Sequence, residues 1–258
     1  MKLLKSVILA AMAATVLSAC GGGNSVGEEL GITKPSVRYI HAIPSGPNVD
    51  FYNNNVIAES NAAYSSVSAY NTFSSGATTL SYNATGSTAA LATSPTFNAA
   101  NGHLYTALAI VGSSAIPAMA VIDDPFDKGL LNNQARVRAF NASYNANAVG
   151  PIDIYLVPVG NTNIASATPQ MANVGYGAAV PASGQDSVYL NGGSYQIVIT
   201  HAGSKTAIFT STGVSLANNA DWLVTTLPTG GLGTVTPDSI QVLVANNAGG
   251  NGTVLTPQ

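Results

Sequence analysis

Two short blocks of this chain are the main guide to its architecture: Val37-Arg38-Tyr39-Ile40-His41-Ala42 and Pro47-Asn48-Val49-Asp50-Phe51-Tyr52. Both recur in the same order about one hundred residues later. The first returns as Val137-Arg138-Ala139-Phe140-Asn141-Ala142 and the second as Gly150-Pro151-Ile152-Asp153-Ile154-Tyr155. In each block a charged residue stands between apolar neighbours, as on a strand with a buried face. The recurrence predicts that one structural unit occurs twice.

Two later blocks extend the match across both halves of the chain. Residues 79–88 match residues 196–206, and residues 97–105 match residues 214–222. The repeat is longer than the periods of solenoid proteins, so each copy should be a domain with its own core. The expected boundaries are 37–127 and 135–246 for the two domains, 128–134 for a linker and 247–258 for a C-terminal tail.

Period-two alternation indicates that the domains are built from β-strands. Three runs place apolar residues on one face: Tyr195, Ile197 and Ile199; Ile240, Val242 and Val244; and Leu104, Thr106, Leu108 and Ile110. Turns rich in Gly, Pro and Asn separate the runs, and no long amphipathic helical pattern occurs. We predict an all-β protein of two tandem antiparallel β-sandwich domains, immunoglobulin-like or transthyretin-like in architecture. The strand order stays open.

Composition suits an extracytoplasmic β-protein and excludes several classes of partner. Of the 258 residues, 46% are hydrophobic and only 7% are charged, so the surface is polar through amides and hydroxyls. There are 8 basic and 11 acidic side chains, and removal of Lys2 and Lys5 with a leader would leave 6 basic ones and a net charge of −5. No basic stripe remains that would bind nucleic acid or anionic lipid head groups.

The N-terminus has the pattern of a secretory leader that ends in a lipid-attachment site. Lys2 and Lys5 precede an apolar run, residues 7–16, which is too short to cross a bilayer. The chain's only cysteine, Cys20, closes the tetrad Leu17-Ser18-Ala19-Cys20. This tetrad resembles the lipobox of bacterial lipoproteins, which implies cleavage after residue 19 and acylation of Cys20. Several acyl chains would anchor the protein durably to a membrane.

A short polar segment follows the lipobox. Residues 21–36 contain three consecutive glycines and little apolar area, so residues 20–36 should be the lipidated cysteine and a flexible tether that a protease cuts first. By resemblance to bacterial sorting rules, Gly21 after the cysteine favours the outer membrane. The expected location is therefore the bacterial cell envelope, on the periplasmic face or the cell surface.

The block at residues 37–52 resembles the bacterial domain-of-unknown-function family 4397. The usual family pattern is close to His-Ala-Ser-Pro-Asp-Ala-Pro followed by Val-Asp-Val-Tyr, and the Gly-Ser-Tyr strand at residues 193–195 resembles its second recurring block. Ile43, Ser45 and Gly46 depart from the pattern, and Asn141 replaces the histidine in the second copy. The resemblance implies an exported or surface protein of two such domains and supplies no chemistry.

Two Arg and Asp pairs are repeated, Arg38 with Asp50 and Arg138 with Asp153. One interpretation is a polar site that is built twice. The interpretation that we favour is a cross-strand ion pair that fixes strand register.

No motif in the sequence predicts a metal, cofactor or catalytic centre. His41, His103 and His201 lack the spacing of zinc ligands, and we expect them at strand ends or in loops. No G-x-S-x-G nucleophile elbow and no phosphate-binding loop occurs. We therefore expect no cofactor.

The densest acidic cluster lies where the first domain should meet the second. Asp123, Asp124 and Asp127 could supply part of a Ca²⁺ site, but they offer at most half of the six to eight oxygens that calcium requires. A solvated linker is the favoured interpretation, and cation binding stays open.

These observations favour a lipid-anchored cell-envelope protein that is not an enzyme and that binds a protein or glycan or acts as a structural spacer. Its expected partners are the membrane, through acyl chains on Cys20, and an unidentified protein or glycan. Two alternatives stay open: an envelope hydrolase or other enzyme with an unrecognised site, and a carbohydrate-binding module that uses the abundant Tyr and Asn. Trp222 lies in an alternating run and should be a core residue rather than a sugar platform.

Overall fold

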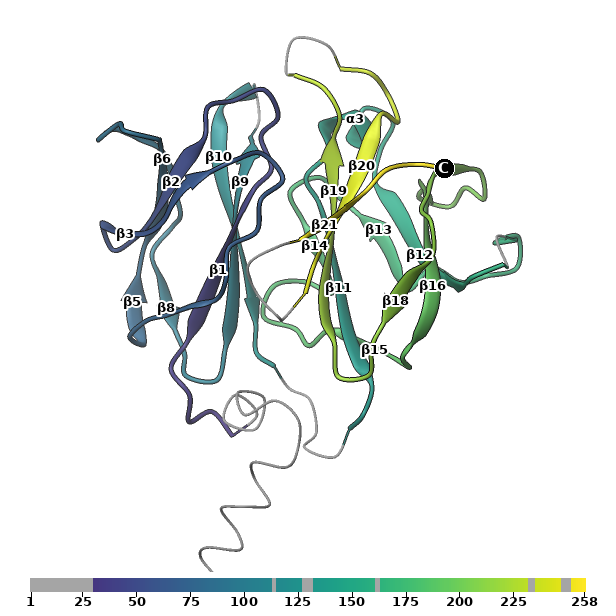
Figure 1. The fold of residues 1–258 in the computed structure, drawn as a ribbon, viewed down its shortest axis with the longest axis horizontal. Helices are drawn as coiled ribbons and strands as arrows, with labels where there is room; N and C mark the ends of the chain where they lie inside the picture. Colours follow the sequence, from purple (N-terminus) through teal and green to yellow (C-terminus); the bar gives the residue numbers. More distant parts are fainter. Residues whose placement is uncertain (1–29, 113–114, 127–131, 161–162, 232–234, 247–251) are drawn as a thin grey trace, which may run out of the picture.

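The computed structural model describes residues 30–112, 115–126, 132–160, 163–231, 235–246 and 252–258. These residues form two β-sandwich units that lie side by side (Figure 1), which confirms the expected all-β fold class. The predicted signal peptide at 1–19, Cys20 and tether residues 21–29 lie outside the described residues. Within the described part of the chain, no helix has the length and hydrophobicity needed to cross a membrane.

The first unit, residues 30–126, has two sheets with the orders β10-β9-β1-β4 and β3-β2-β6-β7, and a small sheet of β5 and β8. Its strands are β1 (Ser36–His41), β2 (Val49–Asn53), β3 (Val56–Ala62), β4 (Asn71–Thr72), β5 (Gly76–Thr78), β6 (Leu80–Ala84), β7 (Ala90–Thr93), β8 (Phe97–Ala99), β9 (Leu104–Val111) and β10 (Pro117–Asp124). Val37, Phe51, Tyr82 and Tyr105 form part of the core between the two sheets.

The second unit, residues 132–258, has two sheets and one short helix. One sheet has the order β14-β11-β19-β20-β21 with β15 also on β11, and the other has the order β13-β12-β16-β17 with β18 on β16. The elements are β11 (Ala135–Asn141), α3 (Tyr144–Asn147), β12 (Ile152–Pro158), β13 (Met171–Val174), β14 (Ala179–Val180), β15 (Val188–Leu190), β16 (Gly193–His201), β17 (Ala207–Thr210), β18 (Val214–Leu216), β19 (Asp221–Pro228), β20 (Ile240–Ala245) and β21 (Thr253–Leu255).

Strand pairing has the same pattern in the two units. Val37 of β1 pairs with Tyr105 of β9, and Val137 of β11 pairs with Trp222 of β19. On the next strand pair, Thr106 aligns with Ile122 in the first unit and Leu223 aligns with Ala245 in the second. These registers define equivalent positions in the two units, such as Tyr105 and Trp222.

The sheets are not purely antiparallel. In each unit the first strand pairs in parallel with a late strand, β1 with β9 and β11 with β19. A parallel pair requires a long crossover connection, and here most of each unit lies between the two strands. The sequence pattern gave no sign of this pairing because alternation is the same in both directions.

The runs of alternating residues are buried as expected, although the run on β9 packs against the second unit and not in the core of its own unit. Ile197, Ile199 and the β20 residues Ile240, Val242 and Val244 lie in the core of the second unit, as does Trp222. Leu108 and Ile110 of β9 are also buried, but they face the second unit. Every residue of β9 is therefore buried, because its other face covers the core of its own unit.

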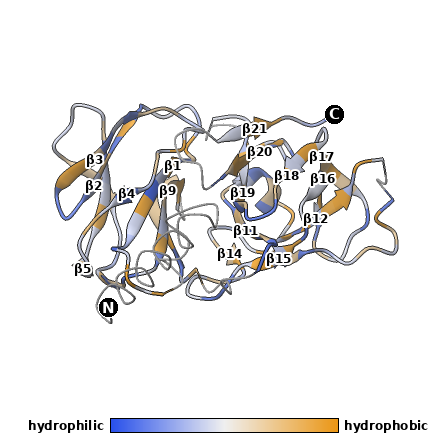
Figure 2. Ribbon diagram, turned by 60° about the horizontal axis from the view of Figure 1, so that its bottom comes forward, coloured by the Kyte–Doolittle hydropathy of each residue, from blue (hydrophilic) through white to orange (hydrophobic). Residues whose placement is uncertain are grey.

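A shared apolar cluster joins the two units. It contains Ile40, Leu108 and Ile110 from the first unit and Phe140, Leu223 and Leu227 from the second. Figure 2 shows hydrophobic residues concentrated along the strands and hydrophilic residues in many of the connecting loops. The two sandwiches thus pack as one body along the outer faces of β1 and β9 and of β11 and β19.

Residues on both sides of the expected domain limits contact the two units. The backbone N–H of Gly102 donates to the carbonyl of Thr33 at 2.9 Å, and that of Phe73 donates to the carbonyl of Pro35 at 3.0 Å, so the end of the expected tether packs on the first unit. The expected C-terminal tail contains β21, which pairs with β20 and buries Leu255.

Candidate functional site

The two repeated aspartates each hold a strand irregularity and a turn, and they do not pair with the repeated arginines. Asp50 Oδ1 accepts hydrogen bonds from the N–H of Asn61 at 2.7 Å and from Thr85 Oγ1 at 3.1 Å, and Oδ2 accepts from the N–H of Gly86 at 3.2 Å. The hydrogen bond from Asn61, together with those from Gly86 and Thr85, holds the pKa of Asp50 below its usual value, although burial opposes this.

Asp153 makes the same two backbone contacts in the second unit. Its Oδ1 accepts from the N–H of Asn173 at 2.7 Å, and its Oδ2 accepts from the N–H of Gly203 at 2.9 Å. Asn61 and Asn173 have positive φ angles of 55° and 56°. Asn61 and Asn173 lie at irregularities in the register of β3 and β13, and Gly86 and Gly203 follow β6 and β16. Each aspartate therefore stabilises one strand irregularity and one turn, both with left-handed backbone.

The predicted Arg38–Asp50 and Arg138–Asp153 ion pairs are wrong. In each unit the arginine lies on the first strand of one sheet and the aspartate on a strand of the other sheet, so they are not cross-strand neighbours. The chain crosses between sheets after β1 and after β11, where a hairpin would have been needed to bring the charges together.

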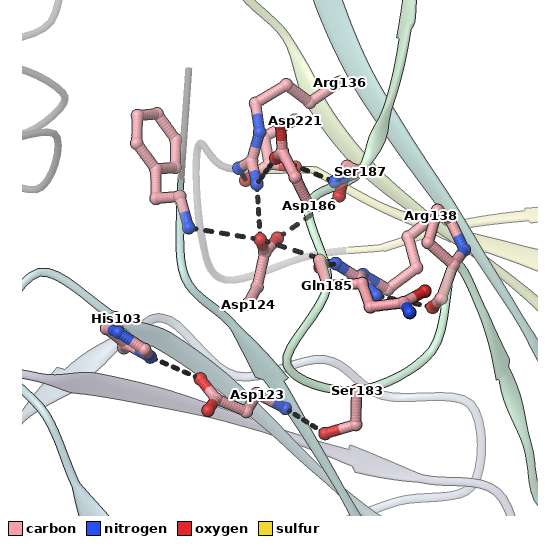
Figure 3. Close-up of polar contacts among 12 residues, drawn as sticks. His103, Asp123, Asp124, Arg136, Arg138, Ser183, Gln185, Asp186, Ser187 and Asp221 are labelled. Atoms are coloured by element: carbon pink, nitrogen blue, oxygen red, sulfur yellow. Dashed lines mark hydrogen bonds and ion pairs between the residues drawn. The ribbon is translucent and has the colours of Figure 1, made fainter. Parts of the chain in front are cut away.

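The strongest charge cluster of the described residues lies at the junction of the two units, around Arg136 (Figure 3). Arg136 is 1% exposed, and its guanidinium donates to Asp221 Oδ2 at 3.1 Å, to Asp186 Oδ1 at 3.1 Å and, through a short bond, to Asp124. The ring of Phe126 lies 4.3 Å from its guanidinium carbon. Asp124 and Phe126 come from the first unit, so Arg136 ties the two units together.

Burial and charge oppose each other in this cluster. Burial alone would lower the pKa of Arg136, but the carboxylates of Asp221 and Asp124 outweigh it and raise that pKa above its usual value. Burial raises the pKa of Asp221, while Arg136 opposes the rise. The guanidinium stays charged because the surrounding carboxylates outweigh the cost of removing it from water.

Arg138 and Arg38 lie beside this cluster and contact mainly uncharged groups. Arg138 donates to the carbonyl of Ala182 at 2.8 Å and, through short bonds, to the carbonyls of Pro181 and Gln185. Burial lowers the pKa of Arg138, and Asp124, 3.5 Å from its guanidinium, opposes this.

Arg38 donates to Thr106 Oγ1 at 2.9 Å and to the carbonyl of Asn246 at 3.2 Å. Its guanidinium carbon also lies 5.1 Å from the ring centroid of Tyr70. Arg38 thus reaches from the first unit to the second, as Arg136 does in the reverse direction.

The acidic cluster is a junction rather than a solvated linker. Asp124 has 15% of its side chain exposed and binds Arg136, while Asp123 contacts His103 Nδ1 at 2.7 Å. The backbone of Asp123 binds the second unit, because its N–H donates to Ser183 Oγ at 2.9 Å and its carbonyl accepts from the N–H of Gly184 at 2.8 Å. The sequence interpretation is corrected for these two residues, and Asp127 lies outside the described residues.

The histidines are separate from one another. His41 ends β1, and its Nδ1 lies 3.1 Å from the carbonyl of Ala62; at the equivalent position Asn141 Nδ2 donates to the carbonyl of Val174 at 3.4 Å. Burial lowers the pKa of His41. His41 and Asn141 thus have the same structural role, which the change of residue type in the second copy concealed.

His201 Nε2 lies 2.8 Å from Asp238 Oδ1, and no other histidine is near it. In the described part of the chain, no group of three or more His, Cys, Asp or Glu residues is arranged to hold a metal ion.

A pocket of 510 Å³ opens at one end of the second unit. Its lining consists of Val214, Ser215, Ala217, Asn218, Asn219, Ala220, Trp222, Val244, Asn246 and Thr253. None of these described residues has an ionisable side chain, so they offer no general acid or base. Trp222 is only 7% exposed and does not present the open ring face on which a sugar stacks.

Sequence reasoning missed the Arg136 cluster. Arg136 and Asp221 are register partners on β11 and β19, and each lies one residue before a matched apolar position. Their shared position before a matched residue is a weak signal, since it predicts an Arg136–Asp221 pair only if the two strands are known to be neighbours. No sequence spacing brings Asp124 and Asp186 to the same guanidinium.

Comparison with family models gave one match. Residues 35–155 match the family described as a domain of unknown function, DUF4397. The match begins before β1 and ends within β12, so it spans the first unit and the start of the second. The comparison with curated proteins gave no match.

Proposed function

We propose that this chain is a lipid-anchored protein of the bacterial cell envelope, in which two β-sandwich units form one rigid body that binds a partner or acts as a spacer and performs no catalysis. The observation that carries the proposal is the junction around Arg136. Carboxylates from both units hold this buried cation, and a shared apolar cluster lies beside it. Together these contacts would hold the two units in one relative orientation.

The positions of the buried charges support a role without catalysis. In the described residues, the most buried charges are engaged with one another or with backbone groups at the junction and at turns. The pocket beside Trp222 is lined by amides, hydroxyls and apolar groups. Neither arrangement offers a substrate both a reactive group and space.

We also propose that residues 135–246 are a second DUF4397 domain. This segment lies mostly beyond the matched residues 35–155. Support comes from the equal strand registers and from Asp153, which makes the same turn contacts as Asp50.

The proposed membrane attachment rests on Cys20. Thr33 contacts the first unit, and an extended chain between Cys20 and Thr33 would reach roughly 45 Å. The rigid body would then stand clear of the lipid head groups.

Mass spectrometry and scattering test the proposal together. Native protein should carry the mass of acyl chains, and Cys20→Ser should remove that mass and move the protein from the detergent phase to the aqueous phase. Small-angle X-ray scattering of the Cys20→Ser protein should fit the compact arrangement of the two units in Figure 1. A wild-type protein without acyl mass, or scattering from two independently moving units, would overturn the proposal.

Crosslinking in native membranes separates a binding role from a spacer role. Val56 and Ile57 lie next to the turn of the β2–β3 hairpin, and their apolar side chains are 68% and 53% exposed. If the protein binds a partner there, Val56→Ser with Ile57→Ser should abolish an enriched crosslink. If no partner is enriched with the wild type, the spacer role stands.

A further inference from the structure

The interface between the two units is built from equivalent residues on both sides. Tyr64 donates a short hydrogen bond to the carbonyl of Pro228, and Tyr176 donates a short hydrogen bond to the carbonyl of Val111. Val67 pairs with Ile40, and Ala179 pairs with the equivalent residue Phe140. Tyr64 lies three residues before Val67 and Tyr176 lies three residues before Ala179, so the two tyrosines are equivalent. The registers of β9 with β10 and of β19 with β20 likewise make Val111 and Pro228 equivalent. The two bonds are therefore reciprocal.

Many of the apolar contacts have the same symmetry, although Leu108 and Leu223 have the polar equivalents Thr225 and Thr106. The shared cluster contains the equivalent pairs Ile40 and Phe140, Ala42 and Ala142, Ile110 and Leu227, and Ile122 and Ala245. When equivalent patches face each other with reciprocal contacts, the interface is that of a two-fold symmetric dimer. Each unit thus carries a sheet face that is complementary to its own counterpart.

The charges break this symmetry. Arg136 of the second unit is equivalent to Ser36 of the first, because they pair with the equivalent residues Asp221 and Leu104. If the first units of two chains paired through this face, Asp124 would meet Ser36 in place of Arg136, and its one remaining cation would be Arg38, the equivalent of the more distant Arg138. The contact of Asp124 with Arg136 is available only between a first unit and a second unit.

We infer that this face is a self-association surface whose second partner is another copy of this chain, and that Asp124 and Arg136 keep it closed within one chain. This inference goes beyond the proposed function. The apolar pairs make the face self-complementary, and the ion pair selects the intramolecular partner. Without Asp124, equivalent faces on two chains can pair with each other.

The test uses the full chain with Cys20→Ser, which has no other cysteine and serves whether or not Cys20 is acylated. Asp124→Ser leaves Arg136 with Asp221 and Asp186, and it should lower the ratio of closed to open junction on the order of a hundredfold. Sedimentation equilibrium should then show a concentration-dependent dimer that the parent chain does not form. Asp124→Asn keeps the shape of the side chain and should shift the equilibrium in the same direction, so it decides the question if Asp124→Ser does not fold.

A matched control and a lock identify the surface used. Asp123→Ser removes the same charge from the adjacent residue, whose carboxylate contacts His103 of its own unit, and this variant should stay monomeric. A Cβ at Gly231 would lie 3.3 Å from the Cβ of Ser45, near the separation found in disulfides. Adding Ser45→Cys and Gly231→Cys to Asp124→Ser should therefore lock the junction on oxidation and restore the monomer. A folded Asp124 variant that stays monomeric, a dimer that persists with the lock closed, or dimerisation of Asp123→Ser would each overturn the inference.

Discussion

The two units share the pairing of their central strands but use their charged residues differently. Asp50 and Asp153 make matching contacts to turn N–H groups, whereas Arg38 and Arg138 have different partners. Arg38 contacts Thr106, Tyr70 and one carbonyl of the second unit, and Arg138 contacts the carbonyls of residues 181–185. Residues that hold the unit's own turns are thus the same in both units, and residues at the junction differ because each faces a different neighbour.

The largest expected difference lies between Arg136 and Arg38. Arg136→Ala would leave Asp221 and Asp124 buried without their cation, so we expect the free energy of unfolding to fall by about 3–5 kcal/mol. Arg38→Ala removes hydrogen bonds to uncharged groups, and we expect a fall of roughly 2 kcal/mol. Urea unfolding followed by circular dichroism measures both. Equal losses would show that the two junction arginines are interchangeable.

The turn aspartates should respond alike. Asp50→Asn and Asp153→Asn each weaken hydrogen bonds from backbone N–H groups, and each should lower the free energy of unfolding by about 1–3 kcal/mol. If one substitution is nearly neutral and the other is severe, the equivalence of the two turns fails.

The contribution of Asp50 to the free energy of unfolding should also depend on pH. The pKa of Asp50 is lower in the folded protein than its usual value of 3.8, so its contribution is present above pH 3.8 and is lost as the pH falls through the folded pKa. Asp50→Asn should remove this part of the acid sensitivity. Unfolding of the wild type and the variant, measured in parallel as a function of pH, tests this prediction. If the two proteins lose stability equally as the pH falls, the prediction is wrong.

The glycines that face these aspartates should show a smaller matched effect. Gly86 and Gly203 have φ angles of +81° and +76°, and nothing lies within 4 Å of a Cβ built at either. Alanine at either position therefore meets only left-handed backbone strain, about 1–2 kcal/mol. Thermal unfolding should show similar losses for both. Gly46→Ala is the control, since Gly46 is not left-handed and a Cβ there would make ordinary contacts, so its effect should be small.

The smallest expected effect distinguishes His41 from Asn141. The folded-state pKa of His41 lies below its usual value of 6.5, so stability is fully present above pH 6.5 and declines as the pH falls towards the folded pKa. Asn141 occupies the equivalent position and does not titrate. His41→Asn should flatten the pH dependence of unfolding just below pH 6.5 while preserving the contact to the carbonyl of Ala62. A variant with unchanged pH dependence would show that His41 does not titrate in this range.

Part of this structure could be predicted from residues that lie close together in sequence. Alternation identified the buried faces of β16 and β20, and the recurring blocks identified β1, β2, β11 and β12. The sequence interpretation of the acidic cluster as a solvated linker is wrong for Asp123 and Asp124, because nothing near them in sequence indicates a cation partner. The lipid anchor at Cys20 remains a prediction from the sequence.

The all-β class and the repeated pattern follow from the sequence, because strand periodicity and turn residues act over a few neighbouring positions. Which charges meet follows only from the packing of the two units. Arg136 binds carboxylates that lie 12, 50 and 85 residues away in sequence, from both units. Such a contact depends on how two sandwiches pack, and Coulomb attraction at a buried site depends on distance in space and on exclusion of water rather than on spacing along the chain.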